Sequence, residues 1–260
     1  MHRAETSEVN QFRVHEPQEL AARLGARHLT LQVAETYLLR PHLRHIRLQG
    51  EELADFTWLP GQDVMIWLAA PDGRRLYRRY TIRHCDNAAR TLDLAVFLHG
   101  KAGPGERWAQ SLQPGEVVDL VGPRGKITLA EAPWHLFVGD EAFLPATLAM
   151  LAALPAGRPA WALLEIASPE EAVPPVTRAD LHLSWIYRGS KDAGDPEPLV
   201  AASRALALPG SSGQVYVGAE LQVARALSAV LEERGFAREQ LSVKAYWVRG
   251  RANAAIGEPK

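Results

Sequence analysis

The chain has 260 residues, 47% of them apolar and 23% charged, an ordinary composition for a soluble globular protein with a sizeable core. Its 29 lysines and arginines balance 30 acidic residues, so net charge gives no reason to expect binding to nucleic acid. The single cysteine, Cys85, excludes an internal disulfide framework and an iron–sulfur cluster held by four cysteines of this chain.

The sequence gives no reason to expect a secretory signal or a membrane span. Met1–Asn10 is polar and lacks the apolar core of a secretory signal. No run approaches the roughly 18 apolar residues that would span a bilayer. We therefore expect a cytoplasmic protein without membrane insertion, and because nothing in the sequence demands an oligomer, we expect a monomer.

The first half of the chain predicts an antiparallel barrel or sandwich. A short helix is expected at Pro17–Leu24, with proline in its first turn and Gly25 after its end. Short apolar runs follow, separated by turn-forming pairs such as Pro60-Gly61 and Pro114-Gly115. A second short helix fits Gly105–Leu112. The expected strands are Leu29–Val33, His45–Leu48, Asp63–Ala69, Arg79–Arg83, Leu92–Leu98 and Val117–Val121.

After Pro133 the pattern changes to strands that alternate with helices. This order predicts a parallel sheet covered on both faces, and such sheets bind ligands at the carboxyl ends of their strands. The expected strands are Trp134–Gly139, Ala160–Ala167, Leu181–Tyr187, Gln214–Gly218 and Leu241–Trp247. The expected helices are Phe143–Leu154, Leu199–Ala207 and Glu220–Arg234.

The stretch from Arg78 to Arg83 (Arg-Arg-Tyr-Thr-Ile-Arg) is the first with candidate chemistry. Arginine suits a pyrophosphate because its planar guanidinium grips phosphate oxygens. Tyr80 and Thr81 offer a flat contact surface and a hydroxyl for a ring system. A charged edge strand with a half-buried tyrosine explains the same pattern equally well.

A glycine-rich turn follows shortly afterwards. Phe97-Leu98-His99-Gly100 leads into Gly103-Pro104-Gly105, where the second helix is expected to begin. Such a turn exposes backbone N–H groups, and a helix N-terminus adds partial positive charge for a phosphate. Most glycine-rich turns are only turns, so its position after the arginine-rich strand is what favours a site.

Taken in order, these motifs resemble those of siderophore-interacting proteins, from about residue 28 to residue 251. No single motif is decisive, but their order and spacing match. The matching stretches are Arg78-x-Tyr80-Thr81-x-Arg83, Leu98-His99-Gly100, Gly103-Pro104-x-x-x-Trp108-Ala109, Gly122-Pro123-Arg124-Gly125, Gly139-Asp140-Glu141-Ala142-Phe143-Leu144-Pro145-Ala146, Trp185-x-x-Arg188, Glu232-Glu233-Arg234-Gly235 and Tyr246-Trp247-x-Arg249-Gly250.

The resemblance implies an N-terminal extension (1–27), a Greek-key FAD-binding β-barrel (28–131) and a Rossmann-like α/β nucleotide-binding domain (132–260), as in ferredoxin-reductase-like enzymes. It implies FAD as cofactor, with NAD(P)H possible. The implied cofactor-binding residues are Arg78, Tyr80, Thr81, Ile82, Arg83, Phe97, Leu98, His99, Ala102, Gly103, Arg107, Trp108, Tyr246 and Trp247. For the last two, a role as core aromatics that close the final strand is an equal alternative.

For nucleotide binding, the resemblance points to Gly139, Asp140, Glu141 and Arg188. This half also departs from the family pattern, because Phe143 stands where a small residue is expected. The dinucleotide fingerprint G-x-G-x-x-G is absent. These departures put pyridine-nucleotide binding in doubt more than FAD binding.

The expected activity is reduction of a ferric siderophore by FAD, with electrons from NAD(P)H or ferredoxin and release of Fe(II) for iron assimilation. Arg124, Lys126, Arg249 and Arg251 are the candidate residues for an anionic chelate, although a solvated surface role fits each of them too. We name no catalytic acid or base and no metal ligand, because the cofactor carries the chemistry. Alternatives are a generic flavin reductase or electron-transfer partner in a biosynthetic pathway, and a non-catalytic relative that binds flavin or another ligand.

Overall fold

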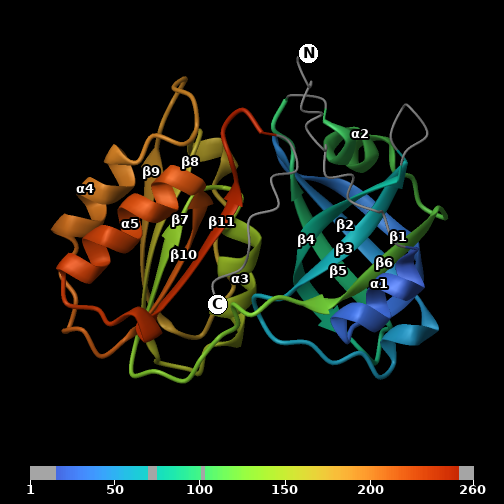
Figure 1. The fold of residues 1–260 in the computed structure, drawn as a ribbon, viewed down its shortest axis with the longest axis horizontal. Coiled ribbons are helices and arrows are strands. Elements are labelled where there is room, and N and C mark those ends of the chain that lie inside the picture. Colours follow the sequence, from blue (N-terminus) through green and yellow to red (C-terminus); the bar gives the residue numbers. More distant parts are fainter. Residues whose placement is uncertain (1–15, 70–74, 101–102, 252–260) are drawn as a thin grey trace, which may run out of the picture.

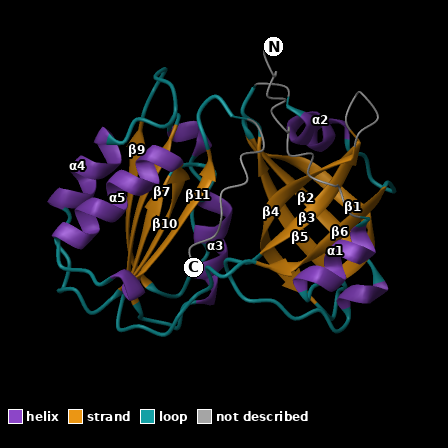
Figure 2. Cartoon of the chain, in the orientation of Figure 1, coloured by secondary structure: helices purple, strands orange, loops and turns teal. Residues whose placement is uncertain are grey.

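The computed structural model describes residues 16–69, 75–100 and 103–251, and it consists of a β-barrel beside an α/β half (Figure 1). Figure 2 shows the strands of the barrel crossing one another and the strands of the other half fanning out in one direction. Within the described residues, no helix is long and apolar enough to cross a membrane.

The barrel is closed by six antiparallel strands in the order β1-β2-β5-β4-β3-β6. Leu29, Ile46, Ile66 and Leu120 are among the apolar side chains that fill its interior, and each is at most 1% exposed. In chain order the elements are α1 (Pro17–Leu24), β1 (Arg27–Arg40), β2 (Leu43–Gln49), a 3-10 helix (Glu51–Leu53), β3 (Asp63–Ala69), β4 (Arg75–Asp86), β5 (Thr91–Phe97), α2 (Pro104–Ser111) and β6 (Val117–Arg124).

The α/β half has a five-stranded parallel sheet in the order β11-β10-β7-β8-β9. Helices α4 and α5 pack together on one face, whereas α3 lies on the face toward the barrel (Figure 1). The elements are β7 (His135–Gly139), α3 (Leu144–Ala153), β8 (Pro159–Ile166), a 3-10 helix (Pro169–Glu171), β9 (Asp180–Tyr187), α4 (Glu197–Ala205), β10 (Gln214–Glu220), α5 (Leu221–Glu233), a 3-10 helix (Arg238–Gln240) and β11 (Leu241–Trp247).

Helix α3 joins the two halves. All of Leu144–Leu151 is buried, because one side of the helix packs on the parallel sheet and another on the barrel strands β4 and β5. Leu43 and Ala95 of the barrel belong to the same apolar cluster as the helix. At the rim of this interface the His42 ring bonds to the buried carboxylate of Glu171. The two halves therefore share a continuous apolar contact with a polar rim.

The predicted fold class is confirmed, and the element types agree with the sequence pattern. Helix α1 has the predicted bounds, because Gly25 adopts φ 60° and ends it. Strand β1 runs seven residues beyond the predicted Val33, to Arg40. Its second half is mostly half-buried or exposed, so it lacks the apolar alternation on which the prediction depended.

Candidate functional site

Strand β4 and the start of α2 meet at one end of the barrel. A Cβ atom on Gly105 would lie 2.6 Å from the Tyr80 hydroxyl and 3.1 Å from Cγ of Arg78. Only glycine therefore lets the first turn of α2 come this close to the strand. The sequence motif on β4 and the glycine-rich turn form one local structure.

This structure concentrates positive charge. Arg78 is half-buried, and its one hydrogen bond within the described chain goes to the carbonyl oxygen of Tyr77. Burial lowers the pKa of Arg78, as it does that of Arg83, for which no ion pair occurs among the described residues. Helix α2 has no side-chain cap at its N-terminus, so its dipole adds to the charge of Arg78. A partly desolvated guanidinium that meets no carboxylate within residues 16–69, 75–100 and 103–251, beside a helix N-terminus, fits a bound pyrophosphate.

An aromatic pair continues the site into the barrel wall. The rings of Tyr80 and Trp108 stack at 5.5 Å between centroids and 21° between planes. Both rings also pack against the barrel core, and burial raises the pKa of Tyr80 well above its ordinary value. The pair is held firmly and forms a flat apolar surface next to Arg78.

Tyr246 reaches the barrel from the other half of the protein. Its hydroxyl is hydrogen-bonded to the side chain of Thr81, and burial raises its pKa. Its ring lies 5.7 Å from that of Phe143, and the Lys244 Nζ atom lies 4.8 Å from the ring centroid. The end of β11 thus faces β4 directly.

A buried carboxylate fixes this contact between the halves. Asp63 of β3 is 2% exposed, and its Oδ2 atom lies 2.7 Å from Nη2 of Arg79 and 2.9 Å from Nζ of Lys244. Nη1 of Arg124 lies 3.4 Å from Oδ1. Burial by itself would raise the pKa of Asp63, but Lys244 and Arg79 outweigh burial and hold that pKa below its usual value. We call these four residues the Asp63 cluster.

A second buried carboxylate lies at the carboxyl end of the parallel sheet. Asp140 follows β7 and accepts hydrogen bonds from the backbone N–H groups of Ala142 and Glu220 and from Nε1 of Trp247. The Glu220 carboxylate in turn caps α5 by accepting a hydrogen bond from the backbone N–H of Gln222. It also accepts one from the backbone N–H of Arg249. These two acids tie the end of β11 to the sheet.

Two further acids at this edge share one arginine. Arg188 bonds to the carboxylate of Glu141, and its Nη1 atom lies 3.8 Å from Oε1 of Glu165. Burial raises the pKa of Glu165 to about 7, although Arg188 opposes the rise. The guanidinium is therefore engaged with protein carboxylates.

Comparison with known proteins identifies the family. Two sequence-family models match the chain. The siderophore-interacting protein family model matches residues 132–250, and the siderophore-interacting FAD-binding domain model matches residues 59–127. The chain belongs to the siderophore-interacting protein family. The FAD-binding model spans β4 and α2, so FAD is the cofactor of this half, and the charge around Arg78 fits its pyrophosphate.

Two curated relatives match about two thirds or more of this chain. An uncharacterized protein of Mycobacterium tuberculosis is 36% identical over 186 residues, which cover 67% of this chain and 65% of that protein. The chain therefore matches slightly less than two thirds of this relative's length. It is also 29% identical over 203 residues to the ferric vibriobactin reductase ViuB of Vibrio cholerae, covering 76% of this chain and 73% of ViuB.

Solved structures show the same fold. A siderophore utilization protein from T. fusca superposes with a TM-score of 0.79 at 27% identity, covering 88% of this chain and 95% of that chain. The siderophore-interacting protein SipS from Aeromonas hydrophila gives 0.76 at 27%, covering 87% and 94%. A ferredoxin NADP+ reductase from Neisseria gonorrhoeae shares the fold, with a TM-score of 0.65 at 14%, covering 85% of this chain and all of that one.

The structure places the cofactor-binding residues predicted for a siderophore-interacting protein in different surroundings. Arg78, Tyr80, Gly103 and Trp108 come together at the start of α2, and exposed Arg107 lies one turn further on. Phe97 and His99 follow on β5 and after it, with ring centroids 5.0 Å apart. The side chains of Ile82 and Leu98 lie in the barrel core. Ala102 lies outside the described residues.

The predicted substrate and nucleotide residues also separate into groups. Lys126, Arg249 and Arg251 are exposed, whereas the half-buried Arg124 forms an ion pair with Asp63. The four predicted nucleotide residues gather at the carboxyl edge of the sheet: Gly139, Asp140, Glu141 and Arg188. The side chains of the last three are already hydrogen-bonded to other groups of the protein.

Sequence reasoning missed the contacts of four residues that hold the site together, although Arg79 lies within the candidate stretch from Arg78 to Arg83. The bonds of Asp63, Arg79 and Lys244 join residues up to 181 positions apart, and nothing in the local pattern indicates them. Glu106 was missed as well: it accepts a bond from the backbone N–H of Gly100 at 2.9 Å and fixes the turn before α2. An acidic residue in the first turn of a helix was the available signal for Glu106.

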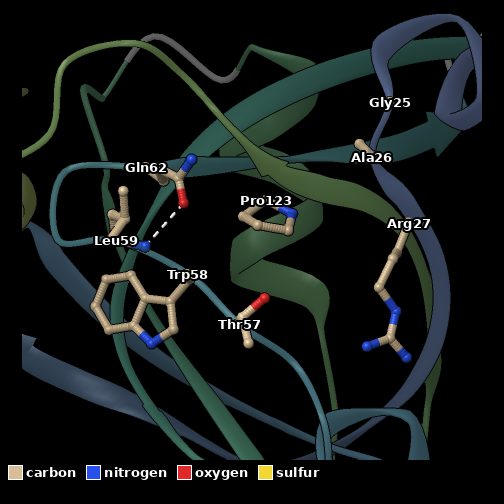
Figure 3. Close-up of a pocket in the computed structure, with 8 residues that line it drawn as sticks. All are labelled: Gly25, Ala26, Arg27, Thr57, Trp58, Leu59, Gln62 and Pro123. Carbon is tan, nitrogen blue, oxygen red and sulfur yellow. Dashed lines mark hydrogen bonds between the residues drawn. The ribbon is translucent and has the colours of Figure 1, made fainter.

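A cavity of about 510 Å³ lies between α1 and the loop before β3 (Figure 3). The Leu59 backbone N–H donates to Gln62 across its wall, and Arg27 is bonded to Asp55 rather than directed at a ligand. Its lining residues are Gly25, Ala26, Arg27, Thr57, Trp58, Leu59, Gln62 and Pro123. None of them belongs to the predicted site.

Asp140→Asn is expected to flatten the dependence of folding stability on pH. Burial, followed by the charge of Glu141, raises the pKa of Asp140 to about 7. A raised carboxyl pKa stabilises the fold below the unfolded pKa of about 4, and this contribution is lost as pH rises through 7. Its upper limit is about 4 kcal/mol.

Urea unfolding of the apoprotein at pH 4, 5.5, 7 and 8 measures this dependence. The wild type should lose more stability than Asp140→Asn between pH 4 and pH 8. Glu165→Gln serves as the comparison, because Glu165 has a similarly raised pKa but does not contact Trp247. Parallel pH profiles for wild type and Asp140→Asn would show that Asp140 has an ordinary pKa.

Proposed function

We propose that this chain is an FAD-dependent reductase that passes electrons from NAD(P)H or ferredoxin to a ferric siderophore and so releases Fe(II). The observation that carries the proposal is Arg78, which is half-buried beside the uncapped start of α2 and has no carboxylate partner among the described residues. The family and the similarity to a ferric vibriobactin reductase support the substrate class. The proposed organisation is a flavin-binding barrel (28–131) and an α/β domain (132–260).

The residues of β4 and α2 would hold the cofactor. Arg78 and the first turn of α2 would bind the pyrophosphate, since both direct positive charge to one place. Tyr80 would provide the flat surface, and Thr81 a hydroxyl near the ring system. When bound, FAD accepts two electrons and returns them singly, which is the chemistry that Fe(III) requires.

The exposed arginines at the end of the chain would attract the chelate. Arg249 follows β11, its side chain is exposed, and its guanidinium donates to the carbonyl oxygen of Ala193. Arg251 is exposed two residues later. Both lie close in sequence to Tyr246, which touches the flavin-binding strand. Positive charge there favours the approach of an anionic ferric chelate.

Anaerobic mixing of photoreduced protein with ferric chelates tests the substrate class. The purified protein should absorb near ~450 nm, as flavoproteins do. Flavin reoxidation should be faster with ferric siderophores than with ferric EDTA, an iron chelate that is not a siderophore. Equal or slower reoxidation would reject the siderophore as substrate, and colourless protein that takes up no FAD would reject the flavoprotein itself.

Arg249→Ala is expected to slow electron transfer to a trianionic ferric chelate several-fold and to leave bound flavin unchanged. The loss is modest because solvent and salt screen an exposed charge. Stopped-flow absorbance in low and high salt measures the rate. The matched control is Arg204→Ala, because Arg204 is an exposed arginine on α4 rather than at the end of β11. An unchanged rate in low salt would assign Arg249 to the solvated surface.

A further inference from the structure

Phe143 fills the space over the ends of two neighbouring parallel strands. It lies in the turn between β7 and α3, immediately before the first residue of α3, and is 1% exposed. A Cβ atom on Gly218 of β10 would lie 2.4 Å from its ring, and one on Gly139 of β7 would lie 2.9 Å from it. Gly139 ends β7 and pairs with Gly218, two residues before the end of β10, and the phenyl ring lies against both glycines.

These strand ends form the switch point of the sheet. From β7 the chain builds outward through β8 and β9, whereas β10 and β11 lie on the other side of β7. In open α/β sheets, ligands bind in the crevice that such a reversal creates at the carboxyl ends. Phe143 therefore stands where a bound nucleotide would enter.

The ring also supports Tyr246. The two centroids are 5.7 Å apart, and Tyr246 is held on its far side by Thr81 of the barrel. Asp140 and Glu220 hold the next residues, Trp247 and Arg249, against the sheet. Two packed aromatic rings thus fill the path from the strand ends to β4.

We propose that Phe143 determines how closely a nicotinamide ring can approach the flavin, and that it thereby selects among electron donors. The inference rests on the function proposed above. Reduction by NAD(P)H breaks the C4–H bond of the dihydronicotinamide, and the hydride carries both electrons to the flavin, leaving NAD(P)+ and reduced FAD. This transfer requires near contact of the two rings. A donor that passes single electrons from the protein surface does not require it.

Phe143→Ala tests the proposal by opening the crevice. We expect NADP+ to bind the apoprotein at least tenfold more tightly in calorimetry, and NADPH to reduce the holoprotein at least tenfold faster in anaerobic stopped flow. Reduction by a ferredoxin should change less than twofold. Phe143→Leu should give intermediate values, and it provides a milder variant if alanine prevents folding.

Phe137→Ala is the matched control. Phe137 lies in the same apolar cluster and is fully buried, but it stacks on Tyr216 two residues before the strand end. This variant should leave NADP+ binding unchanged. If the Phe143 variants bind NADP+ no more tightly than wild type, or if Phe137→Ala gains equally, the proposal is wrong. Photoreduced wild type still tests siderophore reduction separately, because it needs no NADPH.

Discussion

Replacing Arg78 with alanine is expected to weaken FAD binding by about 10- to 150-fold, the equivalent of about 1.5–3 kcal/mol for a lost charge-assisted hydrogen bond. The guanidinium is half-buried and has no carboxylate partner in the described chain. Its burial is therefore uncompensated until an anion binds. Titration of the apoprotein with FAD, followed by flavin fluorescence, measures the change.

The stability of the apoprotein separates this role from a structural one. Removing Arg78 leaves no unpaired acid behind, so the apoprotein should unfold at the same urea concentration as wild type. Arg78→Lys should recover part of the affinity, because it keeps the charge but loses the bidentate geometry. Arg44→Ala is the control, since Arg44 bonds to Thr36 on β1. Undiminished flavin affinity in Arg78→Ala would assign the pyrophosphate to other residues.

Asp63→Asn is expected to destabilise the folded protein by about 3 kcal/mol. Asp63 is almost fully buried, and its removal leaves the positive charges of Arg79, Arg124 and Lys244 without the carboxylate that they share. Equilibrium unfolding in urea at pH 7 measures the loss. The loss should shrink in acid, because a lowered pKa stabilises the fold above the unfolded value near 4 and this contribution disappears as pH falls through the folded pKa.

A double-mutant cycle tests the contact between the halves. Lys244→Met removes one cation but leaves Asp63 with two arginines, so its own cost should be smaller. Adding it to Asp63→Asn should cost little more or restore stability, because the ammonium that had shared the Asp63 carboxylate is then gone. Strictly additive effects would show that Lys244 and Asp63 do not interact in solution.

Together these residues explain how the two halves form one site. Arg78, Tyr80 and α2 belong to the barrel, while Lys244 and Tyr246 come from the last strand of the α/β half. The Asp63 cluster and the Thr81–Tyr246 bond bring that strand against β4. These contacts thereby hold the proposed cofactor residues of the barrel and the end of β11 in fixed relation.

Local patterns in the sequence predict an antiparallel barrel or sandwich, the parallel sheet and the motif from Arg78 to Arg83, and the family resemblance selects the barrel. Alternating apolar residues, turn-forming glycines and helix boundaries act over a few residues, so each element can be inferred from its own segment. Strand β1 shows the limit: its second half was missed because it is barely buried.

The tertiary structure decided which of the predicted residues are available to a ligand. Arg78 and Arg124 look alike in the sequence, but Arg78 has no carboxylate partner in the part of the chain that the structure describes, whereas Arg124 forms an ion pair with Asp63. The sequence suggests Arg188 as a nucleotide ligand, but in the structure its guanidinium lies between the carboxylates of Glu141 and Glu165. Only the fold shows that Phe143 covers Gly218, 75 residues further on. Such pairings depend on how strands and helices pack, and packing brings together residues whose sequence neighbours carry no sign of the contact.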